Sequence, residues 1–215
     1  MSKESITKAV KRALKGAKDR KFQESVDLAI NLKDVDLTLP KNRIDEEIIL
    51  PKGRGKPIKV VVIGSAEMAQ KAKKTADKVI QPEEIEELGD EKRMAKNIAN
   101  SHDFFIAEAP LMPVIGRKLG IVLGPRGKMP KPIPPGADPT GMVENLRKSV
   151  RARSKDKMTF HIPVGTRAMD PDDISDNIET VLKRVKGKLE RGSFNLRSVY
   201  VKTTMGPAFK IEEVD

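Results

Sequence analysis

Glycine and lysine occur together in a segment whose composition could bind the phosphates of a nucleotide. In GPRGK (residues 124–128) only two residues separate the glycines, and Met129 follows the lysine. A phosphate loop needs four residues between the glycines and a Ser or Thr after the lysine. A second turn, GSAEMA (residues 64–69), lacks the further glycines that let a pyrophosphate approach the backbone. Neither segment favours a nucleotide-binding enzyme.

Acid–base and metal chemistry have few candidates. The histidines are His102, which suits a surface turn, and His161, whose place at a strand end suits a structural or RNA-contacting residue as well as a catalytic one. The acidic run EEIEE (residues 83–87) is typical of a solvated helix face. The absence of cysteine excludes disulfides, zinc–thiolate sites and cysteine nucleophiles. We therefore predict no catalytic residue, no metal and no cofactor.

The segment RSVYVKTTMGP (residues 197–207) could contact a sugar–phosphate backbone. Alternation places Val199 and Val201 on one face of a strand. The other face then carries hydroxyls and a cation, from Ser198, Tyr200, Lys202 and Thr204. Gly206 would let the backbone approach a ribose closely, and Pro207 would stiffen the turn. An ordinary edge strand that ends in a turn has the same pattern, so the pattern alone leaves both interpretations open.

The composition points to a folded RNA as the partner. The 215 residues carry a net charge of +11, and no block of the chain is a purely basic tail. Such a surface attracts a polyanion. Aromatic residues make up 3% of the chain, which argues against a platform that stacks successive unpaired bases. Recognition through shape, phosphates and 2′-hydroxyls is the remaining route.

No targeting or membrane segment is apparent. The first twenty residues lack the apolar core of a signal peptide, and no stretch approaches the ~20 apolar residues of a membrane span. We expect a cytoplasmic protein with no membrane partner.

The hydrophobic periodicity changes twice along the chain, which predicts two domains and an α/β fold class. Antiparallel-type elements occupy both ends: a helix at 3–19, strands at 26–32, 47–50, 158–163, 198–204 and 208–212, and a helix at 172–188. Between them, strands at 58–63, 79–80 and 104–107 alternate with helices at 65–77, 82–99, 114–119 and 140–151 around a loop at 124–136. Such alternation is typical of a parallel sheet covered by helices.

A hinge-like segment, PKGRGKP, covers residues 51–57. We therefore expect a discontinuous α+β domain (1–57 plus 153–215) interrupted by an inserted α/β domain (58–152).

Several segments together resemble the family of the first ribosomal protein of the large subunit, the universal stalk protein. They are LRSVYV and TTMGP (196–201 and 203–207), KLG (118–120), LGPRGKMP (123–130) and HIPVG (161–165). The resemblance runs nearly from end to end, and the short glycine hinge is more similar to the archaeal and eukaryotic branch. It implies a split RNA-binding domain, an inserted Rossmann-like domain and no catalysis.

The same resemblance implies the partners. They are the large-subunit rRNA of the mobile stalk beside the exit site, the tRNA in that site, whose release after deacylation the protein would assist, and its own mRNA, whose translation it would repress. We expect the free protein to be a monomer.

The resemblance also implies an RNA-contacting set drawn from both ends of the chain. A Lys-Phe pair and a hydroxyl residue precede the first strand, and a serine and a Thr-Met-Gly triad belong to the last long strand and its turn. These residues are Lys21, Phe22, Ser25, Ser198, Thr204, Met205 and Gly206. The family often has threonine at position 25, and serine retains the hydroxyl but loses a methyl group.

The physical roles of these residues differ. Lys21 and Lys202 would bind phosphates. Phe22 is either a plug in the core or an exposed ring that packs against a ribose or base, and Met205 at a strand end would supply apolar contact to a sugar. The cations of the loop at 124–136, namely Arg126, Lys128 and Lys131, could touch RNA, touch the first domain or be solvated, so we leave them out of the site.

Two other functions remain as hypotheses. One is a nucleotide-binding enzyme that uses the inserted α/β domain, and the other is a translational repressor without a ribosomal role.

Overall fold

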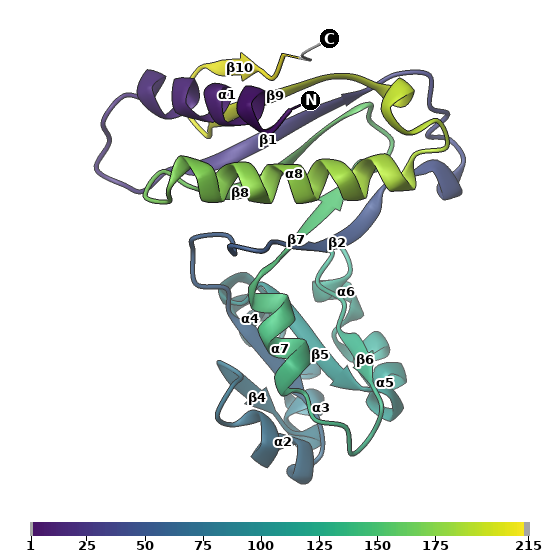
Figure 1. The fold of residues 1–215 in the computed structure, drawn as a ribbon. Coiled ribbons are helices and arrows are strands. Elements are labelled where there is room, and N and C mark those ends of the chain that lie inside the picture. The colour runs from purple at the N-terminus through teal and green to yellow at the C-terminus, as the bar shows by residue number, and fades with distance from the viewer. Residues whose placement is uncertain (1, 213–215) are drawn as a thin grey trace. The chain divides into compact units, whose positions relative to one another are not determined.

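The computed structural model describes residues 2–212, which form two compact units (Figure 1). Unit 1 combines the residues up to Lys56 with those from Lys148 onward, and unit 2 comprises Pro57–Arg147. The mixed helices and strands, with antiparallel sheets in unit 1 and a parallel sheet in unit 2, confirm the predicted α/β class.

Unit 1 is built on a four-stranded antiparallel sheet with the strand order β10-β9-β1-β8. Its strands are β1 (Ser25–Leu32), β8 (Thr159–Thr166), β9 (Leu196–Thr203) and β10 (Ala208–Lys210). The helices α1 (Lys3–Gly16) and α8 (Pro171–Lys188) lie side by side on one face of this sheet (Figure 1). Short 3-10 turns, η1 (Pro40–Asn42) and η3 (Gly192–Asn195), complete the unit.

Strand alternation decides which face of this sheet is buried. Val26, Leu28 and Ile30 of β1 are buried with Val199 and Val201 of β9 beneath the two helices. The intervening residues point to the other face, where polar side chains remain partly accessible. One face therefore builds the core, and the second is available for contacts.

A two-stranded ribbon, β2 (Asp45–Ile49) with β7 (Ser149–Arg153), also belongs to unit 1. The Arg151 guanidinium makes two hydrogen bonds to the Asp45 carboxylate, of 2.7 and 2.8 Å. These bonds, more than the charge itself, hold the pKa of Asp45 below its usual value. The Leu50 amide donates to Lys148 O (2.9 Å), so the chain leaves unit 1 and returns to it at adjacent positions.

The helix predicted at 140–151 was too long, because its last residues belong to the two-stranded ribbon. Helix α7 (Thr140–Arg147) ends four residues earlier, and the following residues form β7. Val150 and Ala152 are buried in the unit 1 core, so pairing with a distant strand overrides the local helical pattern. The boundary between the units accordingly lies at 147/148 rather than 152/153. The helix expected at 65–77 is also shorter, because α2 ends at Ala72. The other helices and strands expected from the sequence occur within a few residues of their expected positions.

The segment after β2 is held by one buried side chain. Asn177 of α8 is fully buried; it accepts a hydrogen bond from the Lys52 amide (3.1 Å) and donates to Gly53 O (2.8 Å) and Val164 O (2.9 Å). A single amide group thus joins α8, β8 and the beginning of the glycine-rich segment.

Unit 2 is a parallel sheet with the order β4-β3-β5-β6 and helices on both faces. The strands are β3 (Val60–Ile63), β4 (Lys78–Ile80), β5 (Phe104–Glu108) and β6 (Lys131–Ile133). One apolar cluster packs the sheet against α3 (Pro82–Asp90), α4 (Lys92–Ser101), α5 (Met112–Lys118) and α6 (Gly120–Leu123). A second cluster packs the opposite face against α2 (Ala66–Ala72) and α7. The 3-10 turn η2 (Ala109–Leu111) links β5 to α5.

The loop at 124–136 is more structured than its composition suggested. It contains β6, and two of its cations bind within unit 2. Lys128 Nζ donates to Ala99 O (2.8 Å) and His102 O (2.7 Å), and Arg126 donates to Asn100 Oδ1 (3.0 Å) and Val122 O (2.9 Å). Lys128 thus satisfies carbonyls at the C-terminal end of α4, where positive charge is favourable, and Arg126 joins the Asn100 side chain to α6.

Within residues 2–212, no helix combines the length and the apolar character needed to cross a membrane.

We expect Asn177→Ala to destabilise unit 1 by about 1–3 kcal/mol, because it removes three hydrogen bonds and leaves buried groups unpaired. Chemical denaturation of the full chain, followed through the transition that unfolds unit 1, measures the change. Asn42→Ala is the matched control, because Asn42 makes one exposed hydrogen bond, to Asp36 O. Equal midpoints for wild type and Asn177→Ala would contradict this account.

Candidate RNA-binding interface

The antiparallel pairing of β1 with β9 brings the two ends of the chain together. In this register Val26 is opposite Thr203, Asp27 is opposite Lys202 and Asn31 is opposite Ser198. The start of β1 therefore lies beside the end of β9, although about 175 residues separate them in the sequence. Six of the eight residues expected to contact RNA lie on or just outside this pair of strands.

The turn after β9 is fixed by hydrogen bonds to the start of β1. The Thr204 amide donates to Ser25 O (3.0 Å), and the Thr204 hydroxyl lies within hydrogen-bonding distance of Ser25 O (3.1 Å) and Asp27 Oδ2 (2.9 Å). The Gly206 amide closes the turn onto Thr203 O (3.0 Å). The turn is thus an ordered surface.

Gly206 cannot be replaced without moving either this turn or the Thr203 side chain. A Cβ at this position would collide with the buried hydroxyl of Thr203, and it would lie 3.8 Å from Ala17 Cα. The sequence pattern suggested that glycine here permits close approach of a ligand. The structure adds that glycine also leaves room for the buried Thr203 side chain.

A buried carboxylate holds the turn from beneath. Glu24 is 1% exposed; its Oε1 accepts a hydrogen bond from the Met205 amide (3.2 Å) and forms an ion pair with Arg20 Nε (3.3 Å). Its Oε2 is buried and has no hydrogen-bond partner within the described residues. Glu24 was not among the predicted site residues, because a charged residue between Gln23 and Ser25 has no pattern that marks it as buried. Its place directly before a strand was the only available signal.

Two large apolar side chains project from this ordered surface. Phe22 is 59% exposed and Met205 is 60% exposed. Phe22 is therefore not a plug in the core, which settles the alternative that the sequence left open. Exposed apolar groups beside hydroxyls suit a partner with both apolar and hydrogen-bonding atoms, such as a ribose.

Ser198 lies apart from the turn. Six residues of extended strand place it about 20 Å from Thr204. Its hydroxyl accepts a hydrogen bond from Asn31 Nδ2 (2.8 Å), and Thr159 donates to Asn31 Oδ1 (2.7 Å). These residues line a hollow of about 300 Å³ together with Leu32, Met158, Arg197 and Tyr200. The structure thus brings Lys21, Phe22, Ser25 and residues 204–206 to one end of the sheet and leaves Ser198 at the other.

The two lysines of the predicted set are accessible. Lys21 is exposed in the segment between α1 and β1, and Lys202 is partly exposed on the open face of β9. Neither makes an ion pair with any described residue. Both are therefore available to phosphates.

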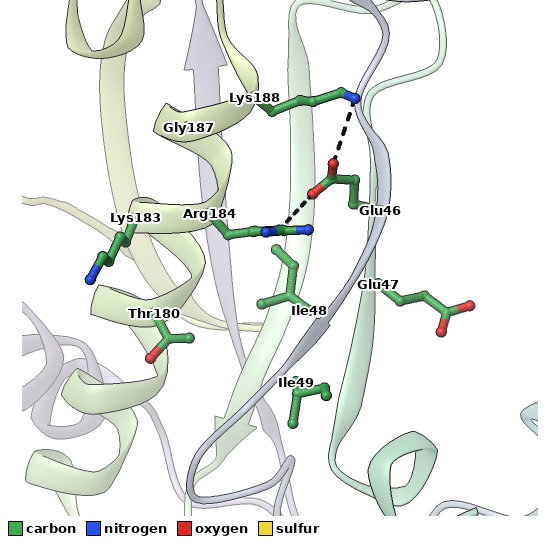
Figure 2. A pocket seen from close by; sticks show the side chains of 9 residues that line it. All are labelled: Glu46, Glu47, Ile48, Ile49, Thr180, Lys183, Arg184, Gly187 and Lys188. Carbon is green, nitrogen blue, oxygen red and sulfur yellow. Dashed lines mark hydrogen bonds and ion pairs between the residues drawn. The ribbon is translucent and has the colours of Figure 1, made fainter. Parts of the chain in front are cut away.

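A second hollow in unit 1 lies between β2 and α8 (Figure 2). It measures about 570 Å³, and Figure 2 shows Arg184 and Lys188 directed at the Glu46 carboxylate. The separations are 2.9 Å for Arg184 Nε and 3.6 Å for Lys188 Nζ. Glu46 neutralises the cations that would otherwise attract an anion, so this hollow is a weaker RNA site than the turn. Among the described residues, no group of His, Asp and Glu side chains could hold a metal ion.

Comparison with known proteins places these features in one family. A family model described as "Ribosomal protein L1p/L10e family" matches residues 5–207. The chain is 54% identical over 215 residues to "Large ribosomal subunit protein uL1" of Thermoplasma acidophilum, covering 100% of this chain and 99% of that protein. It is 53% identical to the protein of the same name from Methanocella arvoryzae, covering 98% and 100% of the two chains. The corresponding protein of Archaeoglobus fulgidus is 52% identical, with 98% and 99% covered.

We expect Glu24→Ala to expose the Met205 amide to solvent exchange about tenfold faster, because the variant removes the acceptor that the amide uses. Hydrogen–deuterium exchange followed by NMR measures the rate. Glu24→Gln retains an oxygen acceptor and should keep most of the protection, and amides of α8 serve as an internal control. An unchanged rate in Glu24→Ala would show that the carboxylate does not hold the turn.

Proposed function

The chain belongs to the ribosomal protein L1p/L10e family, and from this premise we propose that it binds the rRNA of the mobile stalk near the tRNA exit site. Family membership confirms the resemblance seen in the sequence. It makes the chain a structural constituent of the large ribosomal subunit and not an enzyme. Its place of action is therefore the cytoplasmic ribosome.

The observation that carries the proposed site is the ordered, exposed turn at 204–206. Its backbone is fixed by Ser25 O and Glu24, so its shape exists before RNA arrives. A preformed surface loses less conformational entropy on binding than a mobile one does. The side chains that project from it, Met205 and Thr204, are exposed.

Each residue of the proposed site has a distinct chemistry. The Thr204 hydroxyl directs its proton toward Ser25 O or Asp27, which leaves its lone pairs to accept a hydrogen bond from a 2′-hydroxyl. Phe22 and Met205 offer apolar surface to a ribose or base. Lys21 and Lys202 offer positive charge to phosphates. Together they suit the sugar edge of a folded RNA.

Two further roles follow from the resemblance and belong to the same proposal. On the stalk, the protein would assist the release of deacylated tRNA from the exit site. Free of the ribosome, it would bind its own mRNA through a mimic of the rRNA site and repress translation. The support from the structure is the exposed turn, because one such surface would bind two RNAs of similar shape.

The rival hypothesis of a nucleotide-binding enzyme gains no support from unit 2. Nucleotides bind at the carboxyl ends of strands in such sheets. There the Ser65 hydroxyl donates to the buried Glu108 carboxylate (2.7 Å), which puts negative charge where a phosphate would sit. A thermal-shift assay that showed tight nucleotide binding would revive the hypothesis. Co-sedimentation with large subunits separates the ribosomal role from that of a stand-alone repressor.

We expect Met205→Asp to weaken binding to large-subunit rRNA by about 30-fold or more, since central contacts of an interface dominate its affinity. Thr204→Ala should also cost more than the removal of any single surface lysine. Met94→Asp is the matched control, because Met94 is an exposed methionine of unit 2 and the change of charge is the same. Filter binding and backbone footprinting measure these effects, and equal losses from all variants would argue against a specific site.

If about five phosphates are contacted, log K should fall with log salt at a slope of about −3 to −4.5.

We expect the same Met205→Asp change to relieve repression of a reporter that carries the protein's own mRNA leader, because both RNAs would use one surface. Reporter yield with wild-type protein, Met205→Asp and Met94→Asp gives the comparison. Full repression by Met205→Asp would separate the mRNA site from the rRNA site.

A further inference from the structure

Helix α1 exposes a row of cations on the side opposite its buried face. Its buried residues include Ile6, Val10 and Ala13, which pack into the unit 1 core. At 100° per residue, four of the five cations of the helix fall within about 100° of arc on the opposite side, and Lys3 lies outside this arc. We call these four exposed residues the α1 stripe: Lys8, Lys11, Arg12 and Lys15.

The α1 stripe is not neutralised by nearby acids. Within residues 2–212, none of its members makes an ion pair. Three neighbouring acids have other partners: Asp176 pairs with Lys3, Asp173 with Lys52 (3.0 Å) and Asp19 with Arg167 (2.7 Å). Asp172 lines a hollow together with Lys8 and Lys11 but makes no ion pair with either, so the four cations of the stripe outnumber the acids beside them. Glu4 is the acidic residue within α1. It lies in the first turn, where its negative charge interacts favourably with the positive end of the helix dipole. The stripe therefore keeps its positive charge for an external partner.

The end of α1 packs against the turn of the proposed RNA site. A Cβ added to Gly16 would lie 3.2 Å from the Phe209 ring and 3.2 Å from Pro207 Cγ. Ala17 likewise approaches Gly206. Lys15 thus precedes the residues that touch the turn, and Lys18 and Lys21 continue the positive charge along the segment that leads to Phe22.

We propose that the α1 stripe is a second RNA-binding surface, which binds backbone phosphates next to the RNA segment contacted by the turn at 204–206. This inference rests on the proposed function and extends its footprint along α1. Lys8 and Lys15 are about 10 Å apart along the helix axis, so the stripe spans more than one phosphate. Lysines on flexible stems bind phosphates as point charges and demand no particular base.

The composition of the stripe favours RNA over other polyanions. A protein partner normally requires an apolar or aromatic anchor at the centre of the contact, and the stripe contains none. A membrane surface would need the apolar face of α1, which the core already buries. Phosphates alone match a row of accessible cations without apolar neighbours.

The test compares two triple variants of the full chain on large-subunit rRNA transcribed from the same organism. Lys8→Gln, Lys11→Gln and Lys15→Gln together remove three charges of the stripe. Lys73→Gln, Lys92→Gln and Lys96→Gln remove three exposed charges from unit 2. Glutamine has a helix propensity close to that of lysine, so both variants should fold, which circular dichroism checks.

We expect the stripe variant to bind about 10- to 100-fold more weakly near 0.1 M salt and to reduce the slope of log K against log salt by about 2. The unit 2 variant should change both quantities much less. Thr204→Ala should lower affinity with little change of slope, because it removes a sugar contact rather than phosphate contacts. Equal losses from the two triple variants would overturn the proposal, since net charge alone would then explain them.

Directed cleavage locates the stripe on the RNA. The chain has no cysteine, so Lys11→Cys provides a unique position for an iron chelate that generates hydroxyl radicals. Cleavage should cluster beside the nucleotides protected by the turn, whereas Lys73→Cys should give a different pattern or none. Absence of cleavage from Lys11→Cys in a complex that still forms would overturn the inference alone. If the wild-type protein does not bind the rRNA, the proposed function itself fails.

Discussion

The antiparallel pairing of β1 with β9 is the interaction on which the remaining features depend. It joins residues 25–32 to residues 196–203, closes the core beneath α1 and α8, and brings Ser25 to Thr204. Without this pairing, the Thr204 amide and hydroxyl would lose the Ser25 carbonyl that fixes them. The architecture of unit 1 and the shape of its RNA-facing turn are therefore consequences of one ladder of backbone hydrogen bonds.

Much of this arrangement could be predicted from the sequence because strand and helix periods are local properties. The alternation around Val199 and Val201 indicated which face of β9 is buried, and the family resemblance indicated which polar residues gather beyond its end. The burial of Glu24 and Asn177 could not be predicted, since each is buried by partners more than 100 residues away in the sequence. Strand β7 was read as helix for the same reason, because its partner β2 lies about 100 residues earlier.

Some cations of the chain are paired within the fold, and others are free to attract an external partner. Arg184 and Lys188 are matched by Glu46, and Lys128 satisfies carbonyls at the end of α4, so these cations serve the fold. The four cations of the α1 stripe, and Lys18 and Lys21 before β1, have no ion-pair partner within the described residues, whereas Lys3 pairs with Asp176 and Arg20 with Glu24. Part of the unpaired positive charge of unit 1 therefore lies close to its ordered turn.

The position of β1 in the sheet has a consequence for the order of events during protein synthesis. Its two hydrogen-bonded neighbours, β8 and β9, begin at Thr159 and Leu196, long after β1 itself has left the ribosome. All of unit 2 emerges in between. During that interval the nascent chain carries a strand with both edges unpaired and Leu28 and Ile30 uncovered, which is the kind of segment that aggregates or recruits chaperones.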